Sequence, residues 1–579
     1  MMIPRPEHPN PQWERKNWKN LNGQWQFEID NSKSGETRGL PTAEKLSGTI
    51  TLPFCPESEL SGVGEKDFMY AVWYKKNLTF TEEDLCGSRV LFHIGACDFE
   101  THLWVNGKKA GLPHIGGSGP IEYDITDLLV CGSNDVTICA YDDTRAGNQA
   151  GGKQSTTYHS RGCYYTRTTG IWQTVWYEIV PESYIKRAKF YPDVENCTLS
   201  INAELAGCGD LSAEVYYEGK KVGEACKKNK SVTGQLEIAL SEKHLWEPGC
   251  GRLYDVILKF GKDEVKSYFG LRSIELKDMK FLLNGKSVFQ RTVLDQGFYA
   301  DGIWTAPTEE ALIRDIELSM AAGFNGARLH QKVFEPRFLY HADRLGYMVW
   351  GEYSSWGLDV TTKEAVAWFM PDWLSTVHRD FNHPAIVGWC PFNETWMYGP
   401  QRAWQDDAVI RIAYEETKRT DPTRPCIDTS GGIHVATDIM DTHWYEQDGQ
   451  LMRETYEKIS SENYLRLQFA DRDLPWDGKQ PIFVSEYGGI GIHLPEKDKD
   501  RVGAWSYGNS ATSYEEFYAR YESLTHAILD NPKIMGFCYT QLTDVEQEQN
   551  GLFEYATRKP KFDLEIISKI NKKKAAIED

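Results

Sequence analysis

The alternation of apolar and polar residues divides the chain near residue 275. Before that point apolar side chains recur at every second position, as in Trp25–Ile29 and Tyr254–Phe260. A period of two is typical of strands with one buried face, and Asn-Gly pairs such as Asn106-Gly107 favour tight hairpin turns. Short strands, frequent turns and no convincing helix predict two all-β sandwiches, which we divide near Pro181.

From residue 275 onward, apolar runs typical of strands alternate with stretches of helical periodicity. Val288–Leu294 predicts the first strand, and Thr308 is a suitable N-cap for a helix in which Leu312, Ile316 and Met320 form one apolar stripe. About eight strand candidates follow one another at roughly 38 residues per unit, which predicts a (β/α)₈ barrel. A doubly wound open sheet is the alternative, but no glycine-rich phosphate turn follows the first strand.

Composition and charge exclude several classes of partner. The chain has 579 residues, with 64 Lys and Arg against 84 Asp and Glu, and its formal net charge of −20 disfavours binding to nucleic acid. No apolar run approaches the ~18 residues of a membrane-spanning helix. The start of the sequence has no apolar signal segment, so we expect a cytoplasmic location. The 13 cysteines lack metal-binding spacing, and we expect free thiols.

Two apolar runs of the second half end in glutamate. Ile386–Phe392 is followed by Asn393 and Glu394, and Ile482–Ser485 is followed by Glu486. In a (β/α)₈ barrel the chemistry lies at the carboxyl ends of the strands, where a carboxylate is costly unless it is paired or used. Two carboxylates ~5 Å apart form the acid and nucleophile of retaining glycosidases. Each glutamate could instead bind only a loop amide, but the aromatic-rich loops around both favour glycoside hydrolysis.

Eight short segments carry a resemblance to a known family. They are Trp104–Lys108, Tyr123–Thr126, Thr169–Trp176, Phe269–Arg272, Phe281–Lys286, Asn325–Arg328, Asn393-Glu394 and Ser485–Gly488. In this order and spacing the chain resembles glycoside hydrolase family 2, the β-galactosidase, β-glucuronidase and β-mannosidase family, over nearly its whole length. The resemblance implies a jelly-roll sugar-binding domain over residues 1–181, an immunoglobulin-like β-sandwich over 182–274 and a catalytic (β/α)₈ barrel over 275–579.

The resemblance also implies roles for individual residues. Glu394 would be the general acid/base and Glu486 the nucleophile that forms a glycosyl-enzyme. Asn393 would donate a hydrogen bond to the sugar 2-hydroxyl.

Other residues are candidates for positioning Glu486 or binding the sugar. Arg328 would hold Glu486 charged, and Tyr445, which follows Trp444, would donate to it. Period-two alternation places Arg328, His330 and Lys332 on one strand face. Lys332 could then bind an anionic sugar, or it could pair with a barrel acid.

Three segments bear on specificity and cofactors. Glu352–Trp356 replaces the metal-ligand set of large bacterial β-galactosidases, so we expect no catalytic magnesium and no other cofactor. Glu548–Gly551 stands in place of the Asn-x-Lys motif with which β-glucuronidases bind a carboxylate. Asp143 resembles the family position where a jelly-roll aspartate touches the sugar, although a plain turn fits equally well.

These observations predict a retaining exo-β-glycosidase that removes one terminal sugar, with β-galactosidase as the leading specificity. β-Glucuronidase, β-galactofuranosidase and arabinosidase specificities stay open. A non-catalytic carbohydrate-binding protein on the same scaffold is the alternative from another class, and the presence of both glutamates argues against it. The expected partner is an oligosaccharide or other glycoside, and assembly into homo-oligomers stays open.

Overall fold

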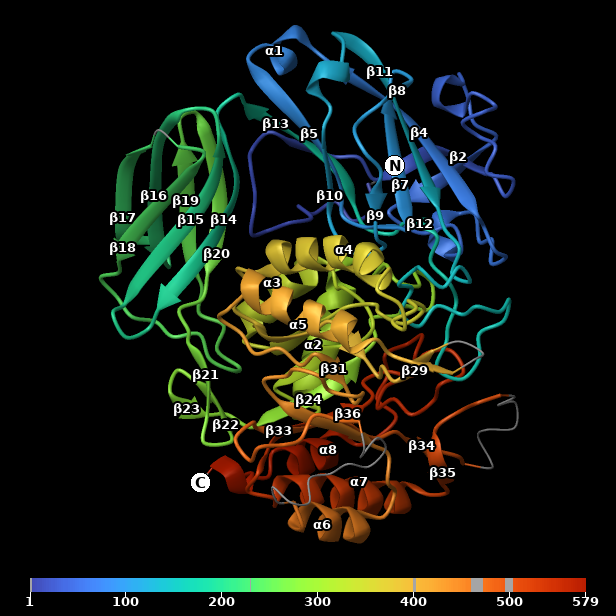
Figure 1. The fold of residues 1–579 in the computed structure, drawn as a ribbon, viewed down its shortest axis with the longest axis vertical. Coiled ribbons are helices and arrows are strands. Elements are labelled where there is room, and N and C mark those ends of the chain that lie inside the picture. Colours follow the sequence, from blue (N-terminus) through green and yellow to red (C-terminus); the bar gives the residue numbers. More distant parts are fainter. Residues whose placement is uncertain (1–2, 230, 399–401, 460–471, 495–502, 579) are drawn as a thin grey trace.

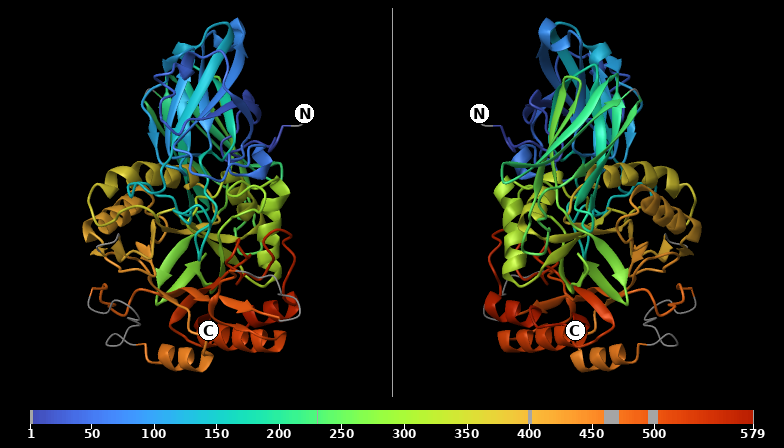
Figure 2. Two further views of the ribbon diagram at one scale, coloured as in Figure 1. Left: turned by 90° about the vertical axis from the view of Figure 1, so that its right-hand side faces the viewer. Right: turned by 90° about the vertical axis from the view of Figure 1, so that its left-hand side faces the viewer.

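The computed structural model describes residues 3–229, 231–398, 402–459, 472–494 and 503–578, and these form two β-sandwiches and one α/β barrel. Both sandwiches lie on the same side of the barrel, and helices α6 to α8 lie at the far end (Figures 1 and 2). The predicted fold class is therefore confirmed. None of the described helices combines the length and apolar character needed to span a membrane.

The first sandwich consists of two antiparallel sheets. One has the order β1 (Trp18–Asn20), β13 (Val175–Pro181), β5 (Ser88–Ile94), β10 (Ile121–Asp124). The other has the order β3 (Gly48–Leu52), β2 (Gly23–Ile29), β4 (Ala71–Phe80), β11 (Gly132–Tyr141), β7 (Glu100–Val105), β8 (Lys108–Lys109), with β9 (His114–Ile115) also paired to β7. The alternation seen in the sequence has the expected cause, since Trp25 and Phe27 point into the core between the sheets.

The second sandwich is smaller and has seven strands. They form the sheets β14 (Tyr184–Asp193), β15 (Thr198–Ala206), β18 (Thr233–Ala239) and β17 (Lys220–Asn229), β16 (Gly209–Tyr217), β19 (Tyr254–Phe260), β20 (Asp263–Phe269). In β18 the buried Leu236 and Ile238 alternate with exposed residues. Strand β13 of the first sandwich ends at Pro181, three residues before β14 begins.

A small hairpin sheet of β21 (Ile274–Lys277), β22 (Lys280–Leu283) and β23 (Lys286–Ser287) precedes the barrel. Seven parallel barrel strands follow in the order β27 (Ile386–Cys390), β26 (Met348–Glu352), β25 (Gly326–Leu329), β24 (Gln290–Asp295), β36 (Ile534–Thr540), β33 (Ile482–Gly488), β32 (Met440–Trp444). The remaining position is filled by the segment that contains β31 (Thr429–Ser430), which pairs with β28 (Phe392–Asn393). The eight strand positions agree with the predicted barrel.

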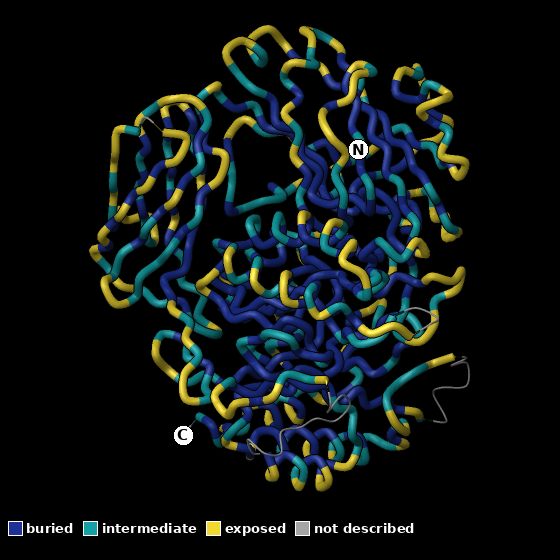
Figure 3. The backbone as a smooth tube through the Cα atoms, viewed as in Figure 1, coloured by how far each residue is buried: buried dark blue, intermediate teal, exposed yellow. Residues whose placement is uncertain are grey.

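Helices cover the outside of the barrel. They are α2 (Glu309–Ala321), α3 (Pro336–Leu345), α4 (Ala365–Asp380), α5 (Asp407–Thr420), α6 (Gly449–Glu457), α7 (Tyr514–Leu529) and α8 (Leu564–Asn571). Thr308 caps α2 as predicted, because its side chain accepts a hydrogen bond from Ala311 N. The buried residues concentrate in the barrel and between the sheets of each sandwich (Figure 3).

A long connection of the first sandwich, residues 142–169, reaches the barrel and runs beside it (Figure 1). Gly151 N donates to Trp356 O at 2.8 Å, and Gly152 N donates to Ser354 O at 3.0 Å. Gly152 has a φ of +60°, and a Cβ there would lie 2.4 Å from Gln331 O, so only glycine fits this close approach. This connection brings residues of the first sandwich to the carboxyl ends of the barrel strands.

Candidate active site

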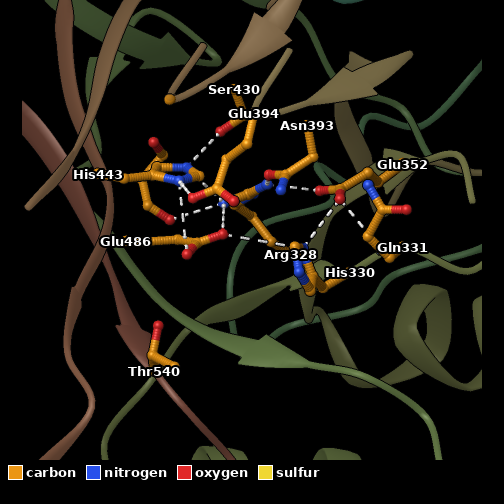
Figure 4. A network of polar contacts seen from close by, with 12 residues as sticks. Arg328, His330, Gln331, Glu352, Asn393, Glu394, Ser430, His443, Glu486 and Thr540 are labelled. Atoms are coloured by element: carbon orange, nitrogen blue, oxygen red, sulfur yellow. Dashed lines mark hydrogen bonds and ion pairs between the residues drawn. The ribbon is translucent and has the colours of Figure 1, made fainter. Parts of the chain in front are cut away.

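Glu394 and Glu486 face each other at the carboxyl ends of the barrel strands (Figure 4). Glu486 belongs to β33, and Glu394 directly follows β28. One side-chain oxygen of each glutamate and one ring nitrogen of His443 all lie within 4.8 Å of one another. This separation is close to the ~5 Å at which retaining glycosidases hold their two carboxyl groups.

Glu486 is buried and bound on both of its oxygens. Arg328 Nη1 lies 3.1 Å from Oε1, and the Tyr445 hydroxyl donates to Oε2. Burial alone would raise the pKa of Glu486, but the positive charges around it, including His443 and Arg328, lower that pKa to about 2. Glu486 is therefore ionised at neutral pH, as a nucleophilic carboxylate must be.

Glu394 has a more open environment. Its backbone has a φ of +50°, an uncommon conformation for a residue with a side chain, and its N–H donates to Ser430 O at 2.8 Å. Oε1 lies 2.8 Å from Nδ1 of His443. The side chain retains 20% of its exposure, so the second oxygen can reach a ligand or water in the site.

His443 links the two carboxylates, and sequence reasoning did not select it. Burial alone would lower the pKa of His443, but Glu486 and Glu394 raise it. Its Nε2 lies 3.0 Å from Ser430 Oγ. The signal was present in the sequence, because alternation from β32 into the next residue places His443 on the same face as Tyr445.

Arg328 connects Glu486 to a third carboxylate that the sequence analysis did not assign to the site. Its Nη2 donates to Glu352 Oε2 at 2.7 Å and to Asn393 Oδ1 at 3.0 Å. Glu352 ends the apolar strand β26, which is the same signal that identified Glu394 and Glu486. Among the described atoms, Asn393 Nδ2 is buried without a hydrogen-bond acceptor and is thus available to a sugar hydroxyl.

His330 lies in the wall of the site beside Glu352. Its Nδ1 is 2.9 Å from Glu352 Oε1 and 3.9 Å from Glu486 Oε1. Burial and the charges of Lys153 and Arg328 lower the pKa of His330 well below its usual value. His330 is therefore neutral near pH 7, and the cations around Glu486 include Arg328, His443 and Lys153.

The prediction that Lys332 shares a face with Arg328 and His330 is wrong. Extended backbone ends at Leu329, and Gln331 has a φ of +50°, which breaks the alternation. The ammonium of Lys332 donates to the carbonyls of Gly297 and Trp304 at 2.5 and 2.6 Å. Lys332 is thus neither aimed at a sugar nor paired with an acid, and burial lowers its pKa to about 8.

Two other predicted substrate contacts are Trp444 and Asp143. Trp444 packs edge-to-face on Tyr456 of α6, with ring centroids 5.7 Å apart, because it lies on the outer face of β32. Asp143 accepts a hydrogen bond from Arg145 N at 3.1 Å within its own turn. This contact fits the plain turn, and a contact of Asp143 with the sugar stays a prediction.

Aromatic residues that the sequence analysis did not select complete the site. Tyr507 of β35 (Tyr507–Ala511) stacks on Tyr445 with ring centroids 3.4 Å apart. Tyr164 and Trp356 lie 5.4 Å apart, one from the first sandwich and the other from the barrel. Each pair joins segments far apart in the sequence, so no local pattern could identify it.

One group of described residues has the composition of a metal site, and it consists of Glu394, His443 and Glu486. In the structure His443 Nδ1 already lies 2.8 Å from Glu394 and 3.5 Å from Glu486. A cation bound there would occupy the same carboxylates that a double displacement needs. The chemistry of this set fits a proton-transfer site better than a metal site, and metal-independent activity stays a prediction.

Comparisons with known proteins identify the family and the fold. The family described as "Glycosyl hydrolases family 2, TIM barrel domain" matches residues 274–493, and the one described as "Glycosyl hydrolases family 2" matches residues 183–272. A β-galactosidase of Leuconostoc mesenteroides is 24% identical over 87% of this chain, which spans about half (49%) of that protein's length. A β-glucuronidase of Sus scrofa is 25% identical over 82% of this chain and 78% of its own.

Solved structures show the same fold at low identity. A β-glucuronidase from an uncultured Clostridium species has a TM-score of 0.76 at 18% identity and covers 99% of this chain and 100% of its own. The β-glucuronidase of Ruminococcus gnavus in complex with D-glucuronic acid has a TM-score of 0.78 at 17% identity, with 98% and 100% covered. Together, the two family matches and the paired carboxylates show that the chain belongs to glycoside hydrolase family 2.

Proposed function

We propose that this chain is a retaining exo-β-glycosidase in which Glu486 is the nucleophile and Glu394 the general acid/base. The observation that carries the proposal is the approach of the two carboxyl groups to within 4.8 Å at the mouth of the barrel. That spacing suits direct attack by one carboxylate. An inverting enzyme instead needs ~6.5–9.5 Å between its two carboxyl groups to admit a water.

In the first step Glu486 attacks the anomeric carbon, and the bond from that carbon to the leaving oxygen breaks. Glu394 gives its proton to that oxygen, and a covalent glycosyl-enzyme forms. In the second step water attacks the same carbon, Glu394 takes the proton of the water, and Glu486 leaves as a carboxylate. The product sugar then has the configuration of the substrate.

The neighbours of the two carboxylates support these roles. Arg328 and the Tyr445 hydroxyl hold Glu486 ionised and oriented. Asn393 Nδ2, unbound in the structure, suits the sugar 2-hydroxyl, a contact that strengthens in the transition state. The connection of residues 142–169 docks on Trp356 and Ser354 beside the mouth, which favours removal of a terminal sugar over cleavage within a chain.

A non-catalytic carbohydrate-binding protein would need neither a charged Glu486 nor the arginine that maintains the charge. The β-galactosidase specificity expected from the sequence stays one proposal among several, because the relatives with printed activities are both β-galactosidases and β-glucuronidases.

The stereochemistry of the product tests this proposal. We expect proton NMR of an aryl β-glycoside digest to show the β-anomer first and the α-anomer only after mutarotation. The α-anomer as the first product would contradict the nucleophilic role of Glu486. A panel of aryl glycosides that share one leaving group selects the sugar for this measurement.

A further inference from the structure

The peptide group between Asn393 and Glu394 is bound at both of its ends. Its carbonyl oxygen, which belongs to Asn393, accepts a hydrogen bond from the Trp356 indole at 3.0 Å. Its N–H, which belongs to Glu394, donates to the Ser430 carbonyl at 2.8 Å. Trp356 lies in the loop after β26 and Ser430 lies in β31. Two separate segments of the barrel therefore fix the orientation of this one peptide group.

These two hydrogen bonds hold Glu394 in a strained conformation. Its φ of +50° crowds the side chain against the backbone, and residues other than glycine seldom adopt it. A flip of the peptide group would relieve this crowding, because the flip changes only ψ of Asn393 and φ of Glu394. It would also turn the carbonyl away from Trp356 and the N–H away from Ser430. Such strain persists only where the surrounding structure maintains it, and here the two hydrogen bonds do so.

Trp356 is itself fixed by the first sandwich. Its carbonyl accepts hydrogen bonds from Gly151 N at 2.8 Å and from Gly152 N at 3.0 Å. Its ring lies 5.4 Å from the ring of Tyr164, which belongs to the same connection of residues 142–169. On the barrel side, its N–H donates to Gln331 Oε1 at 3.0 Å. The docking of the first sandwich on the barrel therefore sets where the indole lies.

We propose that Trp356 is a positioning residue for the acid/base. Its indole N–H holds the Asn393–Glu394 peptide group so that the Glu394 side chain faces Glu486 across the site. Trp356 acts on Glu394 through the backbone, and the first sandwich acts on it through Trp356. This inference rests on the proposed function, in which Glu394 transfers the proton of the leaving oxygen.

The test uses Trp356→Phe, which keeps an aromatic ring in this half-buried position and removes the indole N–H. The substrates are the phenyl and the 2,4-dinitrophenyl β-glycoside of the sugar that the panel selects. Phenolate needs a proton to leave, whereas dinitrophenolate does not. We expect kcat/KM to fall about 10-fold for the phenyl glycoside, the loss typical of one buried hydrogen bond. For the dinitrophenyl glycoside it should stay within about twofold, since that step needs no acid.

The dinitrophenyl glycoside also separates positioning from a merely structural role. Hydrolysis of its glycosyl-enzyme still needs Glu394 as base, so a misplaced Glu394 makes this second step slow and the glycosyl-enzyme accumulates. We expect kcat and KM of Trp356→Phe to fall together, each by about 10-fold. Loss of folded protein would instead lower kcat and leave KM unchanged. An unchanged KM, or an equal loss of kcat/KM for both substrates, would overturn the assignment.

Trp476→Phe is a matched control, because it removes the same kind of hydrogen bond. The Trp476 indole donates to the carbonyl of Gln480, also at 3.0 Å. Gln480 lies just before β33, at the opposite end of that strand from the site. We expect Trp476→Phe to keep the ratio of the two kcat/KM values within about twofold. A ratio that changes as much as in Trp356→Phe would overturn the specific role of Trp356.

Failure of the proposed function is recognised separately. If the protein cleaves no glycoside of the panel, the glycosidase proposal fails, and crystal structures of the protein and of Trp356→Phe still test the positioning role without turnover. We expect the variant to show the Asn393–Glu394 peptide flipped, with a negative φ at Glu394 and the Glu394 side chain moved away from His443. A peptide group and a Glu394 side chain that stay in place would overturn it.

Discussion

Glu486 and Glu394 lie in one site, but their surroundings differ in ways that match two chemical tasks. Glu486 retains 4% of its side-chain exposure and is bound by Arg328 and Tyr445, whereas Glu394 retains 20% and contacts His443. The permanent cation Arg328 binds the first, and the titratable ring of His443 lies between both. The difference teaches that burial and a permanent cation set Glu486 apart, whereas Glu394 stays open to ligands and water.

Removing the nucleophile should have the largest effect. Glu486→Gln retains the size of the side chain but cannot form the glycosyl-enzyme, so we expect kcat to fall by about 10⁴-fold or more. Steady-state kinetics with an aryl glycoside checks this, and circular dichroism verifies the fold. Substantial residual activity would show that Glu486 is not the nucleophile.

Removing the acid/base should have an effect that depends on the leaving group. Glu394→Ala should lower turnover by ~10²–10⁴-fold for aglycones that need a proton, but spare formation of the glycosyl-enzyme from dinitrophenyl glycosides. Azide needs no general base, so added azide should raise turnover and yield a β-glycosyl azide. An α-azide would show that the roles of Glu394 and Glu486 are exchanged. An equal loss for every leaving group would show that Glu394 is not the acid/base.

Replacing Arg328 with lysine should make the environments of Glu486 and Glu394 more alike. Arg328→Lys keeps a charge but cannot reach Glu486, Glu352 and Asn393 at once, and we expect kcat/KM to fall ~10–100-fold. With the opposing charge held less closely to Glu486, the pKa of Glu486 should rise from about 2. Glu486 must be ionised to attack, so the acid limb of the pH profile of kcat/KM should move to higher pH. An unmoved acid limb would assign Arg328 a purely structural role.

Metal removal should have the smallest effect. His443 already bridges Glu394 and Glu486, and we expect full activity after dialysis against EDTA. Added Zn²⁺ should inhibit by binding these three ligands. Activity that is lost in EDTA and restored specifically by Mg²⁺ would contradict the interpretation of Glu394, His443 and Glu486 as a proton-transfer site.

The sequence predicts the features that depend on local periodicity. Alternation identified strands such as β2 and β19, and apolar runs that end in glutamate located Glu394 and Glu486. Alternation placed Lys332 wrongly, because Gln331 has a positive φ and turns the chain after Leu329.

Long-range packing accounts for the residues that the sequence analysis did not select. Lys153 reaches the site only because residues 142–169 dock on Trp356 and Ser354. Tyr507 reaches it by stacking on Tyr445. Neither position carries a periodic signal, because the contacts join separate domains or distant loops.

Trapping the covalent intermediate tests most directly which of the two carboxylates is the nucleophile. The protein would be incubated with a 2,4-dinitrophenyl 2-deoxy-2-fluoro-β-glycoside of its preferred sugar, digested, and sequenced by mass spectrometry. The account predicts one fluoroglycosyl group per chain, attached to Glu486, and none in Glu486→Gln. Attachment to Glu394, or time-dependent inactivation with the label on any other residue, would contradict it.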